Sequence, residues 1–298
     1  MSISKQKLMK IAISSQTDVG KERENNEDNY THCFDLNALS WNQPFAQSYV
    51  PLGSLGAVSI VADGMGGANA GEVASEIAIT SLRNAFQDQS ALTALRTEDE
   101  IHDFLTSAIG KANEAILQHV NEAPDSYGMG TTIVVAWICK EQVHIAWCGD
   151  SRCYRFNLNS GLEMLTKDHS YVQELIDKKE INKDEAINHP DANLITRCLG
   201  DVDTSSVPET KSIPIIDGDF FLLCSDGLCG YCPDRDIEKL LYRHYLELDT
   251  CCHELVKLAL DHGGYDNITV SIVSTLPDGA SAPSLSWRSK LCHFFHIY

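Results

Sequence analysis

The sequence predicts an α+β fold in which the strands are antiparallel. Three runs rich in β-branched or aromatic residues, 131–139, 142–148 and 152–158, follow one another across short polar turns. Spacing this close is typical of antiparallel hairpins. The βαβ pattern that marks a parallel sheet is missing, and helical patterns stand in blocks before and after the three runs.

The first elements with a clear pattern lie before these strands. An apolar run at 55–62 ends at Asp63-Gly64-Met65-Gly66-Gly67 and leads into a helical pattern at 72–86, which predicts strand, turn and helix. Apolar residues recur at helical spacing again at 101–120, so a second long helix is expected there.

The chain leaves the sheet after the three strands and then returns to it. Residues 167–200 are polar, mostly helical in propensity and interrupted by Asn188-His189-Pro190, as in flaps over active sites. The elements expected beyond them are a strand at 220–224, helices at 234–245 and 252–262, and a strand at 268–274.

Composition narrows the functional classes. With 298 residues and 43% hydrophobic content, the chain can build a proper core. Its net charge, 23 minus 42 or -19, disfavours nucleic acid as a partner. No apolar run is long enough to span a membrane and the start lacks a signal-peptide core, so we expect a soluble, cytoplasmic protein. We also expect a monomer. Many of the eleven cysteines lie in apolar runs, which does not indicate disulfides.

Four aspartates stand at the ends of apolar, strand-like runs. Asp63 and Asp226 follow such runs and precede Gly, Asp266 precedes another, and Asp150 follows Trp147-Cys148-Gly149. Taken singly, each is best explained as a turn or a helix cap. Four together suggest a metal centre, because a divalent cation with oxygen ligands compensates the desolvation of carboxylates. Upstream, Arg23 and Glu27-Asp28 join a phosphate-binding cation to further carboxylates.

The order of these motifs resembles the metal-dependent protein phosphatase family, type 2C, in its bacterial form. The resemblance covers residues 15–274. Its motifs, in chain order, are Thr17-Asp18-Val19-Gly20, Arg23 with Asn26-Glu27-Asp28-Asn29, Val61-Ala62-Asp63-Gly64-Met65-Gly66-Gly67, Gly130-Thr131-Thr132, Gly149-Asp150-Ser151-Arg152-Cys153-Tyr154, Lys167-Asp168-His169-Ser170, Leu199-Gly200, Ser225-Asp226-Gly227-Leu228 and Asp266-Asn267-Ile268-Thr269-Val270.

The resemblance implies a four-layer α-β-β-α sandwich, with two antiparallel sheets flanked by helices and a metal centre at one edge. The phosphatase domain is expected at 10–275, with a flap at about 167–200. Residues 1–9 are expected to be an N-terminal extension, and 276–298, rich in Pro, Gly, Ala and Ser before an aromatic end, a linker and tail.

The resemblance also implies roles for individual residues. Asp63 bridges two cations, Gly64 offers its carbonyl, and Asp226 and Asp266 complete one shell. Glu27 and Asp28 act through bound waters, and Asp150 with Asp226 holds a weaker third ion. Arg23 clamps the phosphate, and Asn267 is expected to bind substrate. The catalytic set is Arg23, Glu27 and Asp63.

The implied reaction is hydrolysis of phosphoserine and phosphothreonine in phosphoproteins, the products of a Ser/Thr kinase. Two Mg²⁺ or Mn²⁺ ions would lower the pKa of a bridging water, and the hydroxide would attack phosphorus directly. Two positions depart from the family pattern. Met65 stands where some relatives carry a His proposed as general acid, and Gly230 where relatives often have an acid that helps a third ion.

Other functions compete with this interpretation. Cys229-Gly230-Tyr231-Cys232 with Cys251-Cys252-His253 invites a zinc or redox site, although the second half is an adjacent pair. Gly64-Met65-Gly66-Gly67 is only part of a dinucleotide-binding motif, and no H-E-x-x-H motif is present. A scaffold that binds phosphoproteins without turnover is the remaining alternative, and it would be marked by missing metal aspartates.

Overall fold

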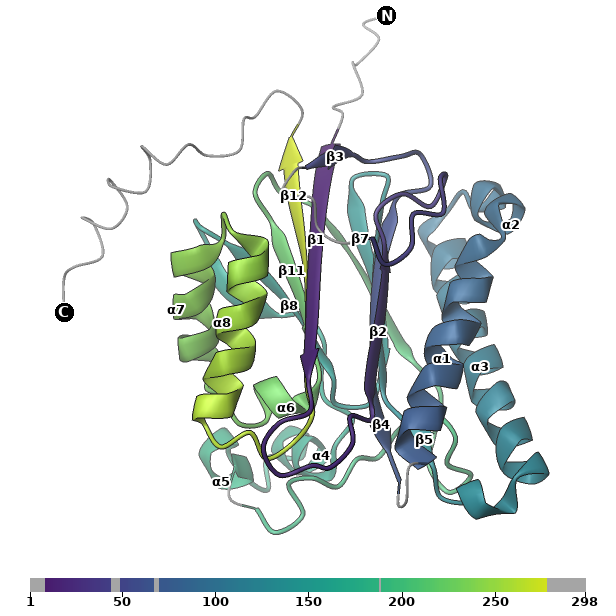
Figure 1. Ribbon diagram of the computed structural model, residues 1–298, viewed down its shortest axis with the longest axis vertical. Coiled ribbons are helices and arrows are strands. Elements are labelled where there is room, and N and C mark those ends of the chain that lie inside the picture. Colours follow the sequence, from purple (N-terminus) through teal and green to yellow (C-terminus); the bar gives the residue numbers. More distant parts are fainter. Residues whose placement is uncertain (1–8, 44–48, 67–69, 188, 278–298) are drawn as a thin grey trace, which may run out of the picture.

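Two antiparallel sheets pack face to face in this computed structural model, which describes residues 9–43, 49–66, 70–187 and 189–277 (Figure 1). The first sheet has the order β3-β1-β12-β11-β8-β9. Its strands are β1 (Met9–Asp18), β3 (Val50–Pro51), β8 (Arg152–Asn157), β9 (Gly161–Met164), β11 (Phe220–Cys224) and β12 (Ile268–Pro277). The second has the order β10-β7-β6-β4-β2, with β5 paired to β4. Its strands are β2 (Asp28–Cys33), β4 (Ala57–Met65), β5 (Gly130–Thr131), β6 (Ile133–Cys139), β7 (Gln142–Cys148) and β10 (Glu209–Pro214).

Helices cover the outer face of each sheet. Against the second sheet lie α1 (Ala70–Gln87) and α3 (Glu98–Glu122), with α2 (Gln89–Ala94) between them in the chain. Against the first lie α6 (Asp226–Cys229), α7 (Asp234–His244) and α8 (Leu248–Asp261). A short 3-10 helix spans Pro124–Ser126. The four-layer α-β-β-α sandwich is therefore confirmed.

The strands are apolar on both faces because each sheet is covered on both sides. Along β6, Val134, Ala136 and Ile138 face the space between the sheets. The intervening residues of β6, such as Trp137, pack under α1 and α3. Both sets are buried, as alternation of side chains along a strand requires. The continuous apolar runs of the sequence therefore come from a sheet with two buried faces.

One predicted hairpin is wrong. The pair β6–β7 is a hairpin, but β8 leaves β7 for the other sheet and pairs with β11. Gly149 makes this crossing with a φ of +116°, where a Cβ would lie 2.6 Å from the side chain of Thr132. A short turn therefore joins the two sheets instead of two neighbouring strands.

Residues 167–200 lie outside both main ladders and contain α4 (Tyr171–Asp177) and α5 (Lys183–Ile187). Their role as a flap stays a prediction. Strand β12 runs to Pro277, two residues into the expected linker. The rest of that linker and tail, 278–298, and residues 1–8 of the expected extension lie outside the described residues.

The ten cysteines in the described part of the chain are buried and form no disulfide. Cys229, Cys232, Cys251 and Cys252 belong to the core between the first sheet and its helices. No helix within the described ranges is both long enough and apolar enough to cross a membrane.

Candidate metal centre

The predicted acidic residues meet at one end of the sandwich. Asp28 begins β2 and lies opposite Asp63 near the end of β4 in the strand register. Asp226 is the first residue of α6, separated from the end of β11 by Ser225, and Asp266 stands two residues before β12. Asp150 lies in the crossing between β7 and β8. Strand ends from both sheets therefore bring together carboxylates that are up to 238 positions apart, from 28 to 266.

These carboxylates are close enough to oppose one another's ionisation. The pKa of Asp63 is raised well above its ordinary value, first because the surrounding protein strips water from the carboxylate. Four neighbouring negative charges add to the shift, those of Asp28, Asp226, Asp150 and Asp266. The side chain at the centre of the predicted site is thus surrounded by every other predicted aspartate.

The pKa values of the other aspartates in the cluster are raised in the same way. Desolvation and then the charge of Asp226 raise the pKa of Asp150 to about 8. Desolvation and then Asp266 raise the pKa of Asp226 to about 6, although a hydrogen bond with Asp63 lowers it. Asp28 is buried, and its pKa rises to about 7 although Ser225 Oγ donates a hydrogen bond of 2.7 Å to its carboxylate. A divalent cation would relieve this repulsion.

Arg23 supplies positive charge at the exposed edge of this cluster. Its Nη2 lies 2.7 Å from Oδ2 of Asp266, and this hydrogen bond raises the pKa of the guanidinium. The side chain is 51% exposed, so the planar fork reaches solvent beside the carboxylates. That position suits contact with a phosphate.

The backbone of Gly64 sits where a side chain cannot fit. A Cβ there would lie 2.2 Å from the carbonyl oxygen of Gly71 and 2.5 Å from that of Glu27. The Gly64 amide donates to the same Glu27 carbonyl at 3.2 Å. Glycine at this position lets β4, the start of α1 and the segment before β2 come together. The carboxylate of Glu27 has a raised pKa, chiefly through desolvation.

Two threonines fix the backbone of Asp63, a role that the sequence alone did not assign. Thr131 Oγ1 donates to the Asp63 carbonyl at 2.9 Å, and the Thr132 amide donates to it at 2.8 Å. The Asp63 amide in turn donates to Thr132 Oγ1 at 3.2 Å. The only signal in the sequence was the motif Gly130-Thr131-Thr132, which carries no chemistry by itself.

Asn267 is buried and holds the loops around the site together. Its Oδ1 accepts a hydrogen bond from the Glu27 amide at 2.7 Å. Its Nδ2 donates to the carbonyls of Val19 and Asn25, both at 2.9 Å. These bonds use both amide hydrogens, so Asn267 positions the surrounding loops, and its expected contact with substrate stays a prediction.

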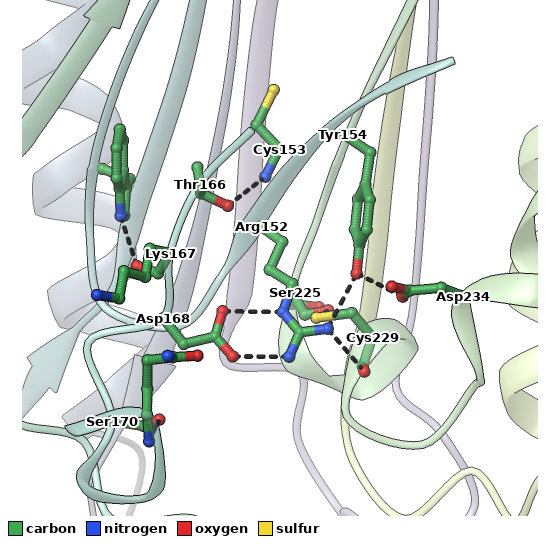
Figure 2. Close-up of polar contacts among 12 residues, drawn as sticks. Arg152, Cys153, Tyr154, Thr166, Lys167, Asp168, Ser170, Ser225, Cys229 and Asp234 are labelled. Carbon is green, nitrogen blue, oxygen red and sulfur yellow. Dashed lines mark hydrogen bonds and ion pairs between the residues drawn. The ribbon is translucent and has the colours of Figure 1, made fainter. Parts of the chain in front are cut away.

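A second charged network lies behind the carboxylates, and Figure 2 shows its centre at Arg152. Arg152 binds Asp168 through two parallel bonds, Nε to Oδ1 at 2.8 Å and Nη2 to Oδ2 at 2.6 Å. Its Nη1 donates to Tyr154 Oη at 2.9 Å and to the carbonyl of Cys229 at 3.3 Å. Tyr154 donates onward to Asp234 at 3.0 Å. Arg152 therefore joins the base of residues 167–200 to the end of α6, the helix that begins with Asp226.

Across the described ranges, no three His, Cys, Asp or Glu side chains are grouped closely enough to coordinate an ion as they stand. This holds for the acidic cluster and for the four core cysteines of the competing zinc hypothesis. The acidic side chains would have to turn toward an ion in order to bind it. Met65, at the end of β4, offers no proton donor.

Comparison with known proteins identifies the family to which this chain belongs. A family model described as Protein phosphatase 2C matches residues 17–268. Serine/threonine phosphatase stp of Listeria welshimeri is 40% identical over 258 residues, 87% of this chain and 93% of that protein. The serine/threonine phosphatase PstP/Ppp of Mycobacterium tuberculosis has a TM-score of 0.72 at 30% identity, covering 89% of this chain and 98% of that one. The catalytic domain of PstP in complex with two manganese ions has a TM-score of 0.71 at 30% identity, covering 90% and 99%. Because the family model spans most of the chain and the fold matches solved phosphatases over most of its length, this protein belongs to the protein phosphatase 2C family of phosphoprotein phosphatases.

Proposed function

We propose that this protein hydrolyses phosphoserine and phosphothreonine monoesters in proteins with two divalent cations. Asp63, the Gly64 carbonyl, Asp226 and Asp266 would hold the cations. The observation that carries this proposal is the cluster of acidic side chains whose pKa values are raised by desolvation and by one another. Such a cluster is costly unless something positive compensates it.

The donor set fits a hard cation. Carboxylate and carbonyl oxygens suit Mg²⁺ or Mn²⁺ better than zinc. The solved PstP complex with two manganese ions supports this choice. When bound, such cations acidify water so that it can attack phosphorus directly at neutral pH. Glu27 and Asp28 would orient waters next to the cations.

The remaining residues bind and position the substrate. Arg23, half-exposed and beside Asp266, would hold two phosphate oxygens with its guanidinium fork and favour the charge-dense transition state. Asn267 and the two threonines would keep Glu27 and Asp63 in place. With Met65 at the end of β4, protonation of the leaving group falls to water in this proposal.

A third cation would rest on Asp150 and Asp226 and would bind weakly, because Gly230 adds no carboxylate. Substrates of a Ser/Thr kinase, a cytoplasmic setting and a monomeric state complete the proposal. The names of the relatives, all serine/threonine phosphatases or protein phosphatases, support the substrate class.

The proposal is tested by release of phosphate from para-nitrophenyl phosphate and from phosphothreonine peptides, with Mn²⁺ and with a chelator. We expect turnover that depends on the cation and returns when Mn²⁺ is restored. No release from folded, Mn²⁺-loaded protein would favour the binding scaffold instead. None of the expected metal aspartates is missing, and their absence would have marked the scaffold.

A further inference from the structure

Two tyrosines lie side by side at the rim of the acidic centre. Tyr265 directly precedes Asp266, and Tyr231 directly follows Gly230, whose amide donates to the Asp226 carbonyl at 2.6 Å. Their ring centroids are 5.4 Å apart and the rings are tilted by 45°. Tyr265 is 53% exposed, one of the few large apolar side chains on the described surface. An aromatic pair therefore adjoins two of the proposed cation ligands.

The loop that carries Tyr265 packs closely against its ring and is tied to Lys21. Gly263 has a φ of +124°, and a Cβ there would lie 2.1 Å from the Tyr265 ring. Lys21 ties the loop down, since its amide donates to the Gly264 carbonyl and its Nζ to the Leu260 carbonyl, both at 2.7 Å. An exposed ring on a tethered loop is an ordered surface, and such a surface binds with a small entropic cost.

The pair also lies within the electric field of the phosphate-binding groups. The pKa of Tyr231 is raised first by desolvation and then by the negative charges of Asp226 and Asp266, while Arg23 lowers it. Arg23 itself is bonded to Asp266, the residue after Tyr265. A phosphate held by Arg23 would therefore have the tyrosines as near neighbours.

We propose that Tyr231 and Tyr265 form an aromatic platform that packs against an apolar side chain next to the phosphorylated residue of a peptide substrate. This inference rests on the proposed function. Neighbouring residues of an extended peptide are only about 3.3–3.6 Å apart along the chain. A side chain beside the phosphoresidue can thus reach rings that adjoin Arg23 and Asp266. The occupant is apolar because the ring faces offer dispersion and stacking contacts, whereas the nearest ionic groups, Arg23 and Asp266, are paired with each other.

The test compares two phosphothreonine peptides that differ only in the residues flanking phosphothreonine, leucine in one and alanine in the other. Wild-type protein is expected to prefer the leucine peptide, and the preference is measured as the ratio of the kcat/KM values for the two peptides. Tyr265→Ala should reduce this preference about 2- to 10-fold, the equivalent of a typical aromatic contact. Tyr231→Ala should reduce it as well, whereas Tyr265→Phe should keep it.

A matched control is Ile216→Ala, which removes another exposed apolar side chain, 57% exposed, before β11 and thus at the end of that strand away from Asp226. The control should leave the leucine preference unchanged. Thermal unfolding of each variant confirms that the comparison is between folded proteins. An unchanged preference in folded Tyr265→Ala, or the absence of any leucine preference in the wild type, overturns the platform.

Binding separates this inference from the proposed reaction. The same two peptides, made with a non-hydrolysable phosphonate in place of phosphothreonine, are titrated by fluorescence anisotropy into Mn²⁺-loaded protein. A leucine preference that Tyr265→Ala abolishes supports the platform even if no peptide is hydrolysed, in which case the proposed function alone fails. Equal affinities for both peptides in the wild type reject the platform even if hydrolysis is normal.

Discussion

Arg152 and Asp168 form a two-bond ion pair between strand β8 and the base of residues 167–200, with bonds of 2.8 and 2.6 Å. The third nitrogen of the same guanidinium reaches the Cys229 carbonyl at the end of α6. One side chain therefore connects the segment predicted to be a flap with the helix that presents Asp226 (Figure 2). In our proposal Arg152 is a positioning residue that does not touch the substrate.

Arg152→Lys should lower both activity and stability. An ammonium group cannot reproduce the parallel bonds to Asp168 and also reach Cys229. Loss of hydrogen bonds to charged groups costs about 1.5–3 kcal/mol. If about 1.4 kcal/mol of this loss destabilises the transition state relative to the free enzyme and substrate, kcat/KM falls about tenfold. Steady-state kinetics and thermal unfolding measure the two effects.

The matched control is Arg155→Lys, three residues further along β8. Arg155 Nη2 binds the fully buried Asp219 at 2.6 Å, far along the strand from the acidic centre. This variant should lose similar stability and keep the kcat/KM of the folded protein. Equal losses of activity in the two variants would show that Arg152 acts only through global stability.

Gly64→Ala should strongly lower cation-dependent activity. The added methyl group would meet two backbone carbonyls at 2.2 and 2.5 Å, and backbone cannot swing aside as a flexible side chain can. The end of β4 would move away from α1 and Glu27, and Asp63 would move with it. Isothermal titration with Mn²⁺ should show a weakened affinity, and the rate should fall in parallel.

Gly110→Ala is the control, because the same change from glycine to alanine should have the opposite effect at this position. Gly110 lies inside α3, and nothing stands within 4 Å of the position of a Cβ. Alanine there should stabilise the protein by about 0.5–1 kcal/mol through helix propensity and leave activity unchanged. Should Gly64→Ala behave like Gly110→Ala, the close packing at Gly64 has no functional role.

Much of this fold could be predicted from the sequence where apolar patterns were strong. The strand at 220–224 has the predicted bounds, and the helices at 72–86 and 101–120 differ by a few residues. Strands β2 and β10 were missed because both carry polar residues, as in Asp-Asn-Tyr-Thr-His-Cys of β2. Their pairing is supplied by distant strands, which a local pattern does not reveal.

The site was also predictable only in part: the acidic residues could be predicted from the sequence, and the residues that hold them in place could not. Acidic residues next to apolar runs predicted the cluster, because burying a carboxylate is costly without compensation. A turn or helix cap explains one such residue but not four together. The supporting residues were not predictable. Thr131 and Thr132 bond to Asp63, and Arg152 bonds to Asp168 and Cys229, all 16 or more positions away. The Asn267 amide faces backbone instead of solvent. Only the folded arrangement shows these partners.

Asp226→Asn should raise the stability of the metal-free protein and lower the Mn²⁺-dependent activity. The substitution removes a negative charge from a crowded cluster, so the metal-free protein should unfold at a higher temperature than the wild type. It also removes a proposed cation ligand. Because changes to the outer partners of metal ligands cost about 10- to 100-fold, loss of a ligand should cost at least that in Mn²⁺-dependent rate.

Asp219→Asn is the control for this experiment. Asp219 is fully buried, but it is paired with Arg155 and Asn157, so its charge is compensated. The variant should therefore unfold at a lower temperature and retain its Mn²⁺-dependent activity. Full activity in Asp226→Asn would contradict the ligand assignment whatever happens to its stability.

The pH dependence of the metal-free protein is set by the raised pKa values of the cluster. The pKa values are about 6 for Asp226, about 7 for Asp28 and about 8 for Asp150, against about 4 in an unfolded chain. Between about pH 4 and the raised pKa of each group, the folded state holds a proton that the unfolded state has lost. The stability contributed by these groups is therefore complete below about pH 4 and is lost as the pH rises through 6 to 8. Thermal unfolding with a chelator should show a falling Tm across this window, and Asp150→Asn should flatten the upper part of it.

Cation binding should show the reverse dependence. An ion can bind only carboxylates that have lost their protons, so binding releases protons and the Mn²⁺ affinity rises with pH, by ~10-fold per pH unit for each proton released. The rise should level off once the ligand carboxylates, Asp63 and Asp226 among them, have lost their protons in the metal-free protein. Titration calorimetry in two buffers with different enthalpies of ionisation counts the protons directly. An affinity that does not change between pH 6 and 8, with no proton release, would mean that these carboxylates do not hold the ion.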